Sequence, residues 1–253
     1  MICITGDTHG IIDIAKLNHV ATALRKVDDE NHYMIIAGDF GMIWQQSYSD
    51  SQINTKDMIA IRRVYEKKPW TTLFVDGNHE NFDILDNLPV TEKWGGKVHE
   101  ITPYCYHLMR GEVYDIEGVK ILALGGAHSV DKAYRKPGIS WWPQEELSEV
   151  DVANAKANLA KHNNEVDFVV SHACPQHVLS FFESQLPPWD ASWWGPKGED
   201  KTCKRLSEAT KDTKYKAWYF GHYHEDLTFH DSDTGIDYKM LFNNVNVWKG
   251  DKA

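Results

Sequence analysis

The most restrictive feature of this sequence is a repeated design, in which a short apolar run leads directly into glycine or serine and then into Asp, Asn or His. It occurs in ICITGDTHG, MIIAGDFG, TLFVDGNHE, FVVSH and AWYFGHYH. Short apolar runs bounded by turn residues predict buried strands. Because ligands bind beyond the carboxyl ends of the strands in an open α/β sheet, we expect the polar residues of all five stretches to meet at one edge.

The segments between these runs predict an α/β fold. Apolar residues recur with helical spacing over 14–24, behind Asp13 as a candidate N-cap, and over 57–65. Together with strands at 2–5, 33–38 and 72–77, the first third reads β-α-β-α-β, which is typical of a parallel sheet. Further expected elements are meandering strands in 98–128 with turns at Arg110–Gly111 and Glu117–Gly118, strands at 166–172 and 217–225, helices at 144–162 and 201–211, a long loop at 186–200, and strands at the end of the chain.

Composition limits the classes of function. No repeat or linker interrupts the sequence, so we expect one domain over residues 1–253. The formal net charge of −10 argues against an extended nucleic-acid surface and is compatible with bound multivalent cations. The four scattered cysteines form no CxxC pair, which favours a reducing compartment. With no signal-peptide pattern and no apolar run of roughly 18 residues, a cytoplasmic protein without membrane contact is expected.

The polar residues expected at the common edge have the chemistry of metal ligands. They are Asp7, His9, Asp39, Asn78, His79, Glu80, His172, His222 and His224. This mixture of oxygen and nitrogen donors suits manganese, iron or zinc better than magnesium alone. Residues i and i+2 at a strand end point the same way. Asp7 is therefore expected to face the same cluster as His9, and His222 is expected to face it together with His224.

Each stretch taken alone has an ordinary structural alternative. The aspartates fit turns after strands, His172 fits a satisfied core position, and Asn78 fits a helix cap. The glycines that precede Asp7, Asp39 and Asn78 permit the sharp turns that bring backbone close to a metal. Five stretches in order, each after a buried strand, favour the metal interpretation.

GDTHG, GDFG, GNHE, a lone SH and GHYH, in that order over residues 6–224, resemble the signature of the calcineurin-like metallophosphoesterase superfamily. The resemblance implies a four-layer αββα sandwich, with two mixed sheets flanked by helices and a metal site at the carboxyl ends of the strands. It also implies two divalent transition metal ions, with Mn²⁺ as the first choice and Fe, Zn or Ni as alternatives.

The resemblance assigns roles to the predicted ligands. Asp7, His9 and His224 would hold one ion, Asn78, His172 and His222 the other, and Asp39 would bridge both. Two such ions, about 3.5–4 Å apart, can generate a bridging hydroxide that attacks a phosphate ester. His79 is expected to protonate the leaving oxygen or to hold the charge of the transition state, and Asn78 and Asp39 to act in catalysis with it.

Departures from the family pattern bear on the substrate. Protein phosphatases of this superfamily carry arginines in GDxxDRG and RGNHE, whereas FGMIWQQ follows Asp39 and Asp76 precedes Gly77 in this chain. A monoester dianion gains more from such cations than a singly charged diester. The sequence therefore favours a phosphodiesterase acting on a nucleotide or another small diester. The alternatives are a phosphomonoesterase or Ser/Thr protein phosphatase of broad specificity, and a catalytically inactive binding or scaffold protein on the same fold.

Two further groups of residues have both a functional and an ordinary interpretation. His128, Lys132 and Arg135, in the loop over 125–138, are candidate phosphate contacts or parts of a solvated charged loop. Six tryptophans are candidates for stacking on a flat substrate group, or for packing loops onto the core. They are Trp44, Trp141, Trp142, Trp189, Trp193 and Trp194. The sequence predicts no oligomeric state.

Overall fold

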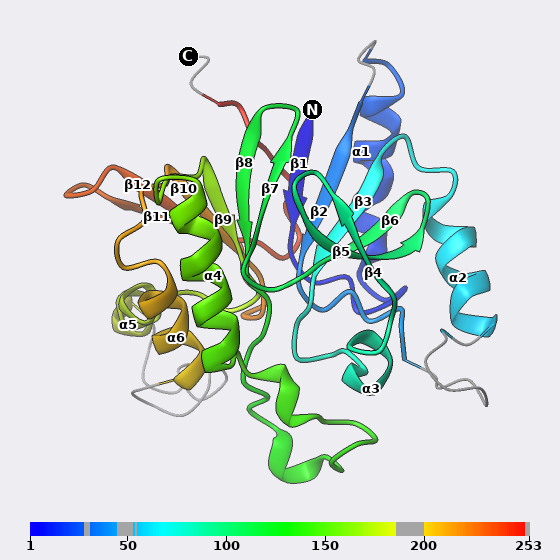
Figure 1. The fold of residues 1–253 in the computed structure, drawn as a ribbon. Helices are drawn as coiled ribbons and strands as arrows, with labels where there is room; N and C mark the ends of the chain where they lie inside the picture. Colours follow the sequence, from blue (N-terminus) through cyan, green and yellow to red (C-terminus); the bar gives the residue numbers. More distant parts are fainter. Residues whose placement is uncertain (28–30, 45–52, 54, 186–199, 251–253) are drawn as a thin grey trace.

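Figure 1 shows two β-sheets packed between two groups of helices, in a computed structural model that describes residues 1–27, 31–44, 53, 55–185 and 200–250. One sheet has seven strands in the order β13-β1-β2-β3-β6-β5-β4, and the other has six in the order β11-β12-β10-β9-β8-β7. Each sheet contains parallel and antiparallel pairs. The predicted fold class, a four-layer αββα sandwich with two mixed sheets, is confirmed.

The elements have the following bounds. The first sheet contains β1 (Ile2–Thr5), β2 (Tyr33–Ala37), β3 (Thr71–Val75), β4 (Val90–Lys93), β5 (Gly96–Thr102), β6 (Cys105–Leu108) and β13 (Asn246–Val247). The second contains β7 (Glu112–Ile116), β8 (Val119–Ala123), β9 (Phe168–Val170), β10 (Ala217–Phe220), β11 (Leu227–Asp231) and β12 (Ile236–Met240). The α-helices are α1 (Leu17–Leu24), α2 (Thr55–Tyr65), α3 (Phe82–Leu85), α4 (Glu149–Lys161), α5 (Gln176–Gln185) and α6 (Lys201–Ala209), and the 3₁₀ turns are η1 (Ile14–Lys16), η2 (Lys132–Tyr134) and η3 (Pro143–Glu145).

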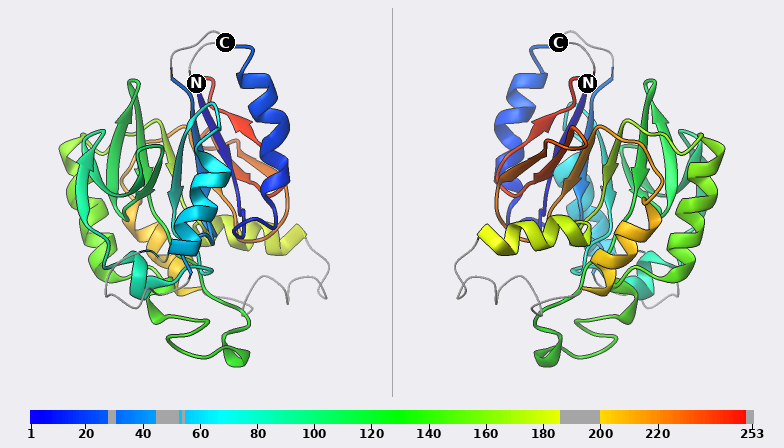
Figure 2. Two further views of the ribbon diagram at one scale, coloured as in Figure 1. Left: turned by 90° about the vertical axis from the view of Figure 1, so that its right-hand side faces the viewer. Right: turned by 90° about the vertical axis from the view of Figure 1, so that its left-hand side faces the viewer.

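The continuous apolar runs form the parallel centres of both sheets. Strands β1, β2 and β3 pair in parallel, and every residue of β1 and β2 is buried, as expected for strands covered on both faces. Strands β8, β9 and β10 also pair in parallel, in the second sheet. Figures 1 and 2 show α1 and α2 beside the first sheet and α4, α5 and α6 beside the second.

The core lies between the sheets and under the helices. Ile4 and Ile35 of the first sheet belong to the same buried cluster as Phe168 and Tyr219 of the second. This shared core supports the single domain expected over residues 1–253, which stays a prediction. No helix within the described residues is long and apolar enough to cross a membrane.

Several expected elements are shorter than the sequence pattern indicates, among them the strand expected at 166–172, which spans Phe168–Val170. The helix expected at 144–162 begins at Glu149, because the hydroxyl of Ser148 accepts from the backbone of Asp151, whose carboxylate accepts from the backbone of Ser148 in return. The strand expected at 217–225 ends at Phe220. The loop expected at 186–200 lies outside the described residues except for Asp200, which caps α6 by accepting from the backbone N–H of Cys203.

Candidate metal centre

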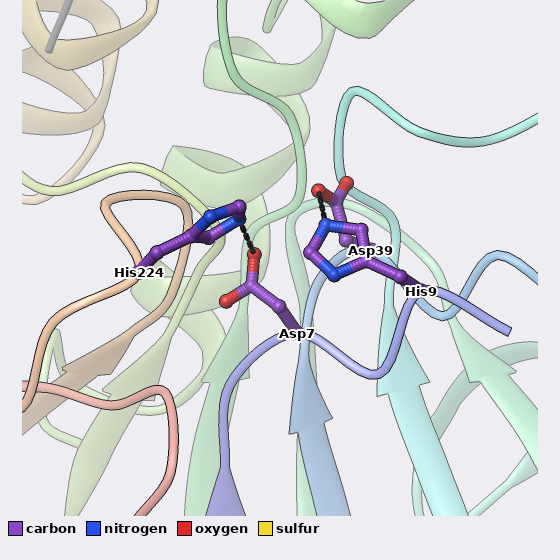
Figure 3. Close-up of side chains that lie close together, drawn as sticks. All are labelled: Asp7, His9, Asp39 and His224. Atoms are coloured by element: carbon purple, nitrogen blue, oxygen red, sulfur yellow. Dashed lines mark ion pairs between the residues drawn. The ribbon is translucent and has the colours of Figure 1, made fainter. Parts of the chain in front are cut away.

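Four of the predicted metal ligands converge from three loops, as Figure 3 shows for Asp7, His9, Asp39 and His224. One donor atom from each of these residues lies within 4.8 Å of the donor atoms of the other three. His9 Nε2 is 3.2 Å from Asp39 Oδ2, and His224 Nε2 is 3.6 Å from Asp7 Oδ1. The loops after β1, β2 and β10 therefore form one cluster.

His172 adjoins the other oxygen of Asp39, and two further predicted ligands adjoin His172. His172 Nε2 lies 3.2 Å from Asp39 Oδ1 and 3.2 Å from Asn78 Oδ1. The ring of His222 packs against that of His172, with 5.0 Å between the centroids. One carboxylate oxygen of Asp39 thus faces His9 and the other faces His172, so Asp39 lies between two halves of the cluster, which also approach each other where His172 Nε2 is 3.9 Å from Asp7 Oδ1.

Left-handed turns direct the side chains of the ligands. The alternation along a strand that the sequence suggested does not direct them. Strand β1 ends at Thr5 and β10 at Phe220, before the ligands begin. Four ligands have positive φ angles, namely His9 (42°), Asp39 (49°), His222 (71°) and His224 (54°). Asp7 and His9 do face one cluster as expected, but turns bring them together and not the alternation along a strand, so the physical reason given for the pairing is wrong. His224 instead packs beside His9, with ring centroids 4.9 Å apart, while His222 turns to the second half.

Glycines next to the ligands leave room for their side chains. A Cβ atom at Gly77 would lie 2.0 Å from Asp39 Oδ1, and one at Gly221 would lie 2.3 Å from Asp7 Oδ2. Of the three glycines expected to permit sharp turns, Gly38 has the left-handed φ of +86° that glycine readily adopts. Gly6 and Gly77 are instead required by close approach, since a Cβ atom would meet the carbonyl of Leu241 at Gly6 and Asp39 at Gly77.

The charges of the cluster fit the binding of divalent cations. Asp7 and Asp39 are buried, and burial raises the pKa of Asp7, with His172 opposing that rise and Asp39 adding to it. Burial alone would lower the pKa of His9 and of His172, but Asp39 outweighs it, and each pKa rises to about 9. The negative charge of the carboxylates therefore favours the protonated form of both imidazoles. Metal ions offset the same charge through the same nitrogen and oxygen donors.

Hydrogen bonds at the back of the ligands direct their free donor atoms inward. His9 Nδ1 pairs with Asp13 at 2.7 Å, and His172 Nδ1 donates to the carbonyl of Ala37 at 2.8 Å, so both rings present Nε2 to the cluster. Asn78 Nδ2 donates to Ser129 Oγ at 3.1 Å, which leaves its amide oxygen facing His172. Asn78 is not the cap of α3, because Asn81 occupies that position.

Sequence reasoning missed several residues that support these ligands. Glu145 accepts from the backbone and the hydroxyl of Ser129, at 2.8 Å and 2.7 Å, and so fixes the partner of Asn78. Glu80 accepts from the backbone N–H of Phe40 at 2.7 Å and thereby holds the turn that follows Asp39. The sequence placed Glu80 at the common edge without this supporting role, whereas no local pattern marks Ser129 or Glu145.

Of the three candidate phosphate contacts, Arg135 reaches the cluster. Its Nη1 and Nη2 atoms lie 3.2 Å and 3.1 Å from the two ring nitrogens of His79. His128 Nδ1 instead pairs with Glu146 at 2.9 Å, and Lys132 Nζ lies 3.5 Å from the same carboxylate. The loop over 125–138 therefore approaches the site through one cation, whose Nε also lies 2.6 Å from Asp131 Oδ1.

Asp76, which stands where the protein phosphatases carry arginine, binds an arginine of its own. The Nε and Nη2 atoms of Arg110 lie 2.9 Å and 2.5 Å from Asp76 Oδ2. Burial would raise the pKa of Asp76, but Arg110 outweighs burial and holds that pKa well below its ordinary value. The charge of Arg110 is thus matched within the protein and does not replace the missing substrate arginine.

The tryptophans within the described residues act mainly as packing groups. Trp142 is buried and donates to Asp83 at 2.8 Å, and Trp44 makes an edge contact with its ring at 5.6 Å. Lys132 Nζ lies 5.7 Å from the ring centroid of Trp141. Trp189, Trp193 and Trp194 lie outside the described residues.

An αββα sandwich with carboxylate, amide and imidazole donors clustered beyond its strand ends defines the class of metal-binding hydrolase domains. The family model described as calcineurin-like phosphoesterase matches residues 1–226, and the chain belongs to this family. The chain therefore carries a metallophosphoesterase domain.

The chain is also similar to one curated protein. It is 26% identical over 251 residues to the lariat debranching enzyme of Schizosaccharomyces pombe, a match that covers 89% of this chain and 48% of that protein. The chain thus spans about half the length of the curated relative.

Solved structures with a related arrangement are more distant in sequence. The protein TT1561 of Thermus thermophilus is 11% identical with a TM-score of 0.47, over 96% of this chain and 89% of that chain. GAP50, the anchor in the inner membrane complex of Plasmodium, is 11% identical with a TM-score of 0.46, over 95% and 70%. At TM-scores below 0.5 these likenesses carry no argument about function.

Proposed function

We propose that this chain is a dinuclear-metal-dependent phosphodiesterase that acts on nucleotides or other small phosphate diesters. The observation that carries the two-ion assignment is the division of the cluster at Asp39, whose two oxygens each lie 3.2 Å from the Nε2 atom of a different histidine. A carboxylate with this arrangement suits a bridge between two cations.

The metal assignment divides the ligands between the two halves. The first ion would be held by Asp7, His9 and His224, the second by Asn78, His172 and His222, and both by Asp39. Mn²⁺ is our first choice because it accepts mixed oxygen and nitrogen donors, and Fe, Zn and Ni remain as alternatives. When bound, two such ions would supply a nucleophile at neutral pH and offset the charge of the phosphate.

The residues around the ions would bind the ester and release its leaving group. Arg135 would contact a phosphate oxygen, since its guanidinium lies against His79 at the edge of the cluster. Burial lowers the pKa of His79, Asp39 opposes that change and Arg135 adds to it. An anionic ester paired with Arg135 would offset the guanidinium charge and so raise the pKa of His79, which would take up a proton from water and pass it to the leaving oxygen.

Two observations favour a diester over a monoester. The first is the scarcity of arginines in the described part of the site, since a monoester dianion gains more from such cations than a diester. Within the described residues, Arg135 contacts His79, whereas Arg110 is bound to Asp76. The curated relative is named for debranching lariats, which supports a diester for this chain as well. A phosphomonoesterase or protein phosphatase of broad specificity is the second candidate. An inactive scaffold is disfavoured because all seven predicted ligands lie in one cluster.

The remaining assignments follow the chemistry of the site. The expected partner is a small phosphate ester such as a nucleotide, and the net charge of −10 argues against an extended nucleic-acid surface. We also propose a cytoplasmic location, on the scattered unpaired cysteines.

The diester preference predicts the outcome of a simple pair of assays. With Mn²⁺ added, the purified chain should hydrolyse bis(p-nitrophenyl) phosphate with a higher kcat/KM than p-nitrophenyl phosphate. The same panel should include cyclic nucleotides, nucleotide diesters, phosphopeptides and RNA, with chelator-treated protein as the control. A monoester turned over about tenfold faster than its bis-ester, a difference of about 1.4 kcal/mol, would overturn the preference.

Replacement of Arg135 tests its contact with phosphate. Arg135→Met should raise KM for a diester about 10- to 100-fold, because it removes a charge-assisted hydrogen bond worth about 1.5–3 kcal/mol. Metal content should not change. The matched control is Lys136→Met, which removes the neighbouring exposed cation of the same loop. Equal KM values for Arg135→Met and the unmodified protein would contradict the assignment.

A further inference from the structure

Lys16 occupies a position behind the first half of the cluster. The residue lies in η1, and its ammonium group donates to the backbone carbonyls of Gly6 at 2.9 Å, Asp7 at 2.6 Å and Phe242. An ammonium group has three donors, and here each has a carbonyl partner. Lys16 therefore joins the turn that carries Asp7 to a segment 226 residues further along the chain.

Phe242, the distant partner, also contacts a predicted metal ligand. Its ring stacks on the imidazole of His224, with 4.7 Å between centroids and 17° between planes, and Lys16 Nζ lies 5.0 Å from its centroid. The side chain of His224 is 51% exposed, and Phe242 covers one face of its ring while His9 makes an edge contact with it. Phe242 lies beyond residues 1–226, which match the family model.

The segment that carries Phe242 is itself held in place. The carboxylate of Asp226 accepts from the backbone N–H groups of Phe242, Asn243 and Asn244, at 2.8 Å, 2.9 Å and 3.0 Å. Thr5 Oγ1 donates to the carbonyl of Asn244 at 2.9 Å, and β13 then pairs with β1. The stacked ring is thus fixed relative to the strand that precedes Asp7.

We propose that Lys16 and Phe242 form a clamp of positioning residues that holds Asp7 and His224 in the geometry required by the first ion. The clamp contacts the first half directly and meets the second half through Asp7, whose carboxylate accepts from the backbone N–H of His222 at 3.0 Å. Within the described contacts, Lys16 and Phe242 do not touch Asn78 or His172 of the second half. The inference rests on the proposed division of ligands between two ions.

Titration of the metal-free full chain with Mn²⁺ tests the clamp. Lys16→Met keeps the aliphatic stem but removes all three donors, and it should weaken one of two binding steps about 10- to 100-fold, as substitutions behind metal ligands do. The other step should stay within about twofold of the unmodified protein. At two equivalents of Mn²⁺ per chain, the unmodified protein should show the EPR signal of coupled Mn²⁺ pairs. Lys16→Met should instead show the signal of single Mn²⁺ ions.

Variants of Phe242 separate positioning from folding. Phe242→Leu removes the flat ring without leaving a buried polar group unpaired, and it should weaken the same step about three- to tenfold. Phe242→Tyr keeps the ring and should retain the affinity of the unmodified protein. Lys26→Met, at an exposed lysine beyond α1, is the matched control and should bind both ions normally.

The outcomes distinguish the clamp from the proposed function. If the unmodified chain binds two ions and both Lys16→Met and Phe242→Leu also bind them with unchanged affinities, the clamp is overturned. If the unmodified chain does not bind two ions, the proposed two-ion function is wrong, and the clamp, which rests on it, is wrong as well. Thermal unfolding shows whether Lys16→Met folds. If it does not, Phe242→Leu decides: a weakened binding step supports the clamp, and an unchanged affinity overturns it.

Discussion

Replacing Asp39 with asparagine should abolish hydrolysis, because the two carboxylate oxygens of Asp39 each lie 3.2 Å from a histidine of a different half of the cluster. Asparagine preserves the shape of the side chain and one oxygen, which can still accept from the backbone N–H of His79 as Asp39 does at 2.8 Å. It removes the negative charge and turns the other oxygen into an N–H donor, which cannot bind a cation. The fall in kcat/KM should exceed the roughly 100-fold cost of disturbing a residue behind a ligand.

Metal analysis of the same variant tests the bridging role directly. The Asp39→Asn protein should bind fewer than two Mn²⁺ ions per chain at concentrations that saturate the unmodified protein. Asp13→Asn is a suitable comparison, because Asp13 contacts His9 Nδ1 from behind and should cost only about 10- to 100-fold. Full activity in the Asp39→Asn protein would refute the bridge.

Replacing His79 with alanine should separate turnover from metal binding. We expect kcat to fall about 10²- to 10⁴-fold, the usual contribution of a positioned general acid, while both ions still bind. The loss should grow as the leaving group becomes a poorer one, because such oxygens need a proton most. A series of aryl diesters with leaving groups of increasing pKa provides the measurement.

A histidine far from the cluster provides the control for that experiment. His19→Ala removes an exposed imidazole from α1 and should leave both kcat and metal content unchanged. If His79→Ala loses a metal ion, or loses the same factor for every leaving group, then His79 is not the proton donor. In the first case it would be a ligand, and in the second it would only orient the ester.

The sequence predicts the parallel centre of this fold because buried strands need continuous apolar runs. ICIT and YMIIA meet that requirement and become β1 and β2. The pairing of β13 with β1 could not be predicted, since it joins the two ends of the chain and no local pattern specifies it. Helix α4 begins later than its apolar pattern indicates because the reciprocal bonds of Ser148 and Asp151 fix its first turn.

The candidate site was predictable where the chemistry lies within one short stretch. GDTHG and GHYH contain their ligands, so the residues could be named before their geometry was known. Lys16 and Phe242 could not be found in this way, because a lysine that binds backbone carbonyls resembles any surface lysine in sequence. The direction of His222 and His224 also depends on φ angles of 71° and 54°, which residue type does not specify.

The glycines beside the ligands have a consequence for how such a protein can diverge. Gly77 leaves no room for a Cβ atom beside Asp39, and Gly221 leaves none beside Asp7, so each pair tolerates change only if both partners change together. On the loop that carries Arg135, Gly138 has open space around a Cβ position, and Tyr134 is 93% exposed. Mutational drift can therefore alter which ester is accepted, one residue at a time, while the metal-binding pairs stay fixed.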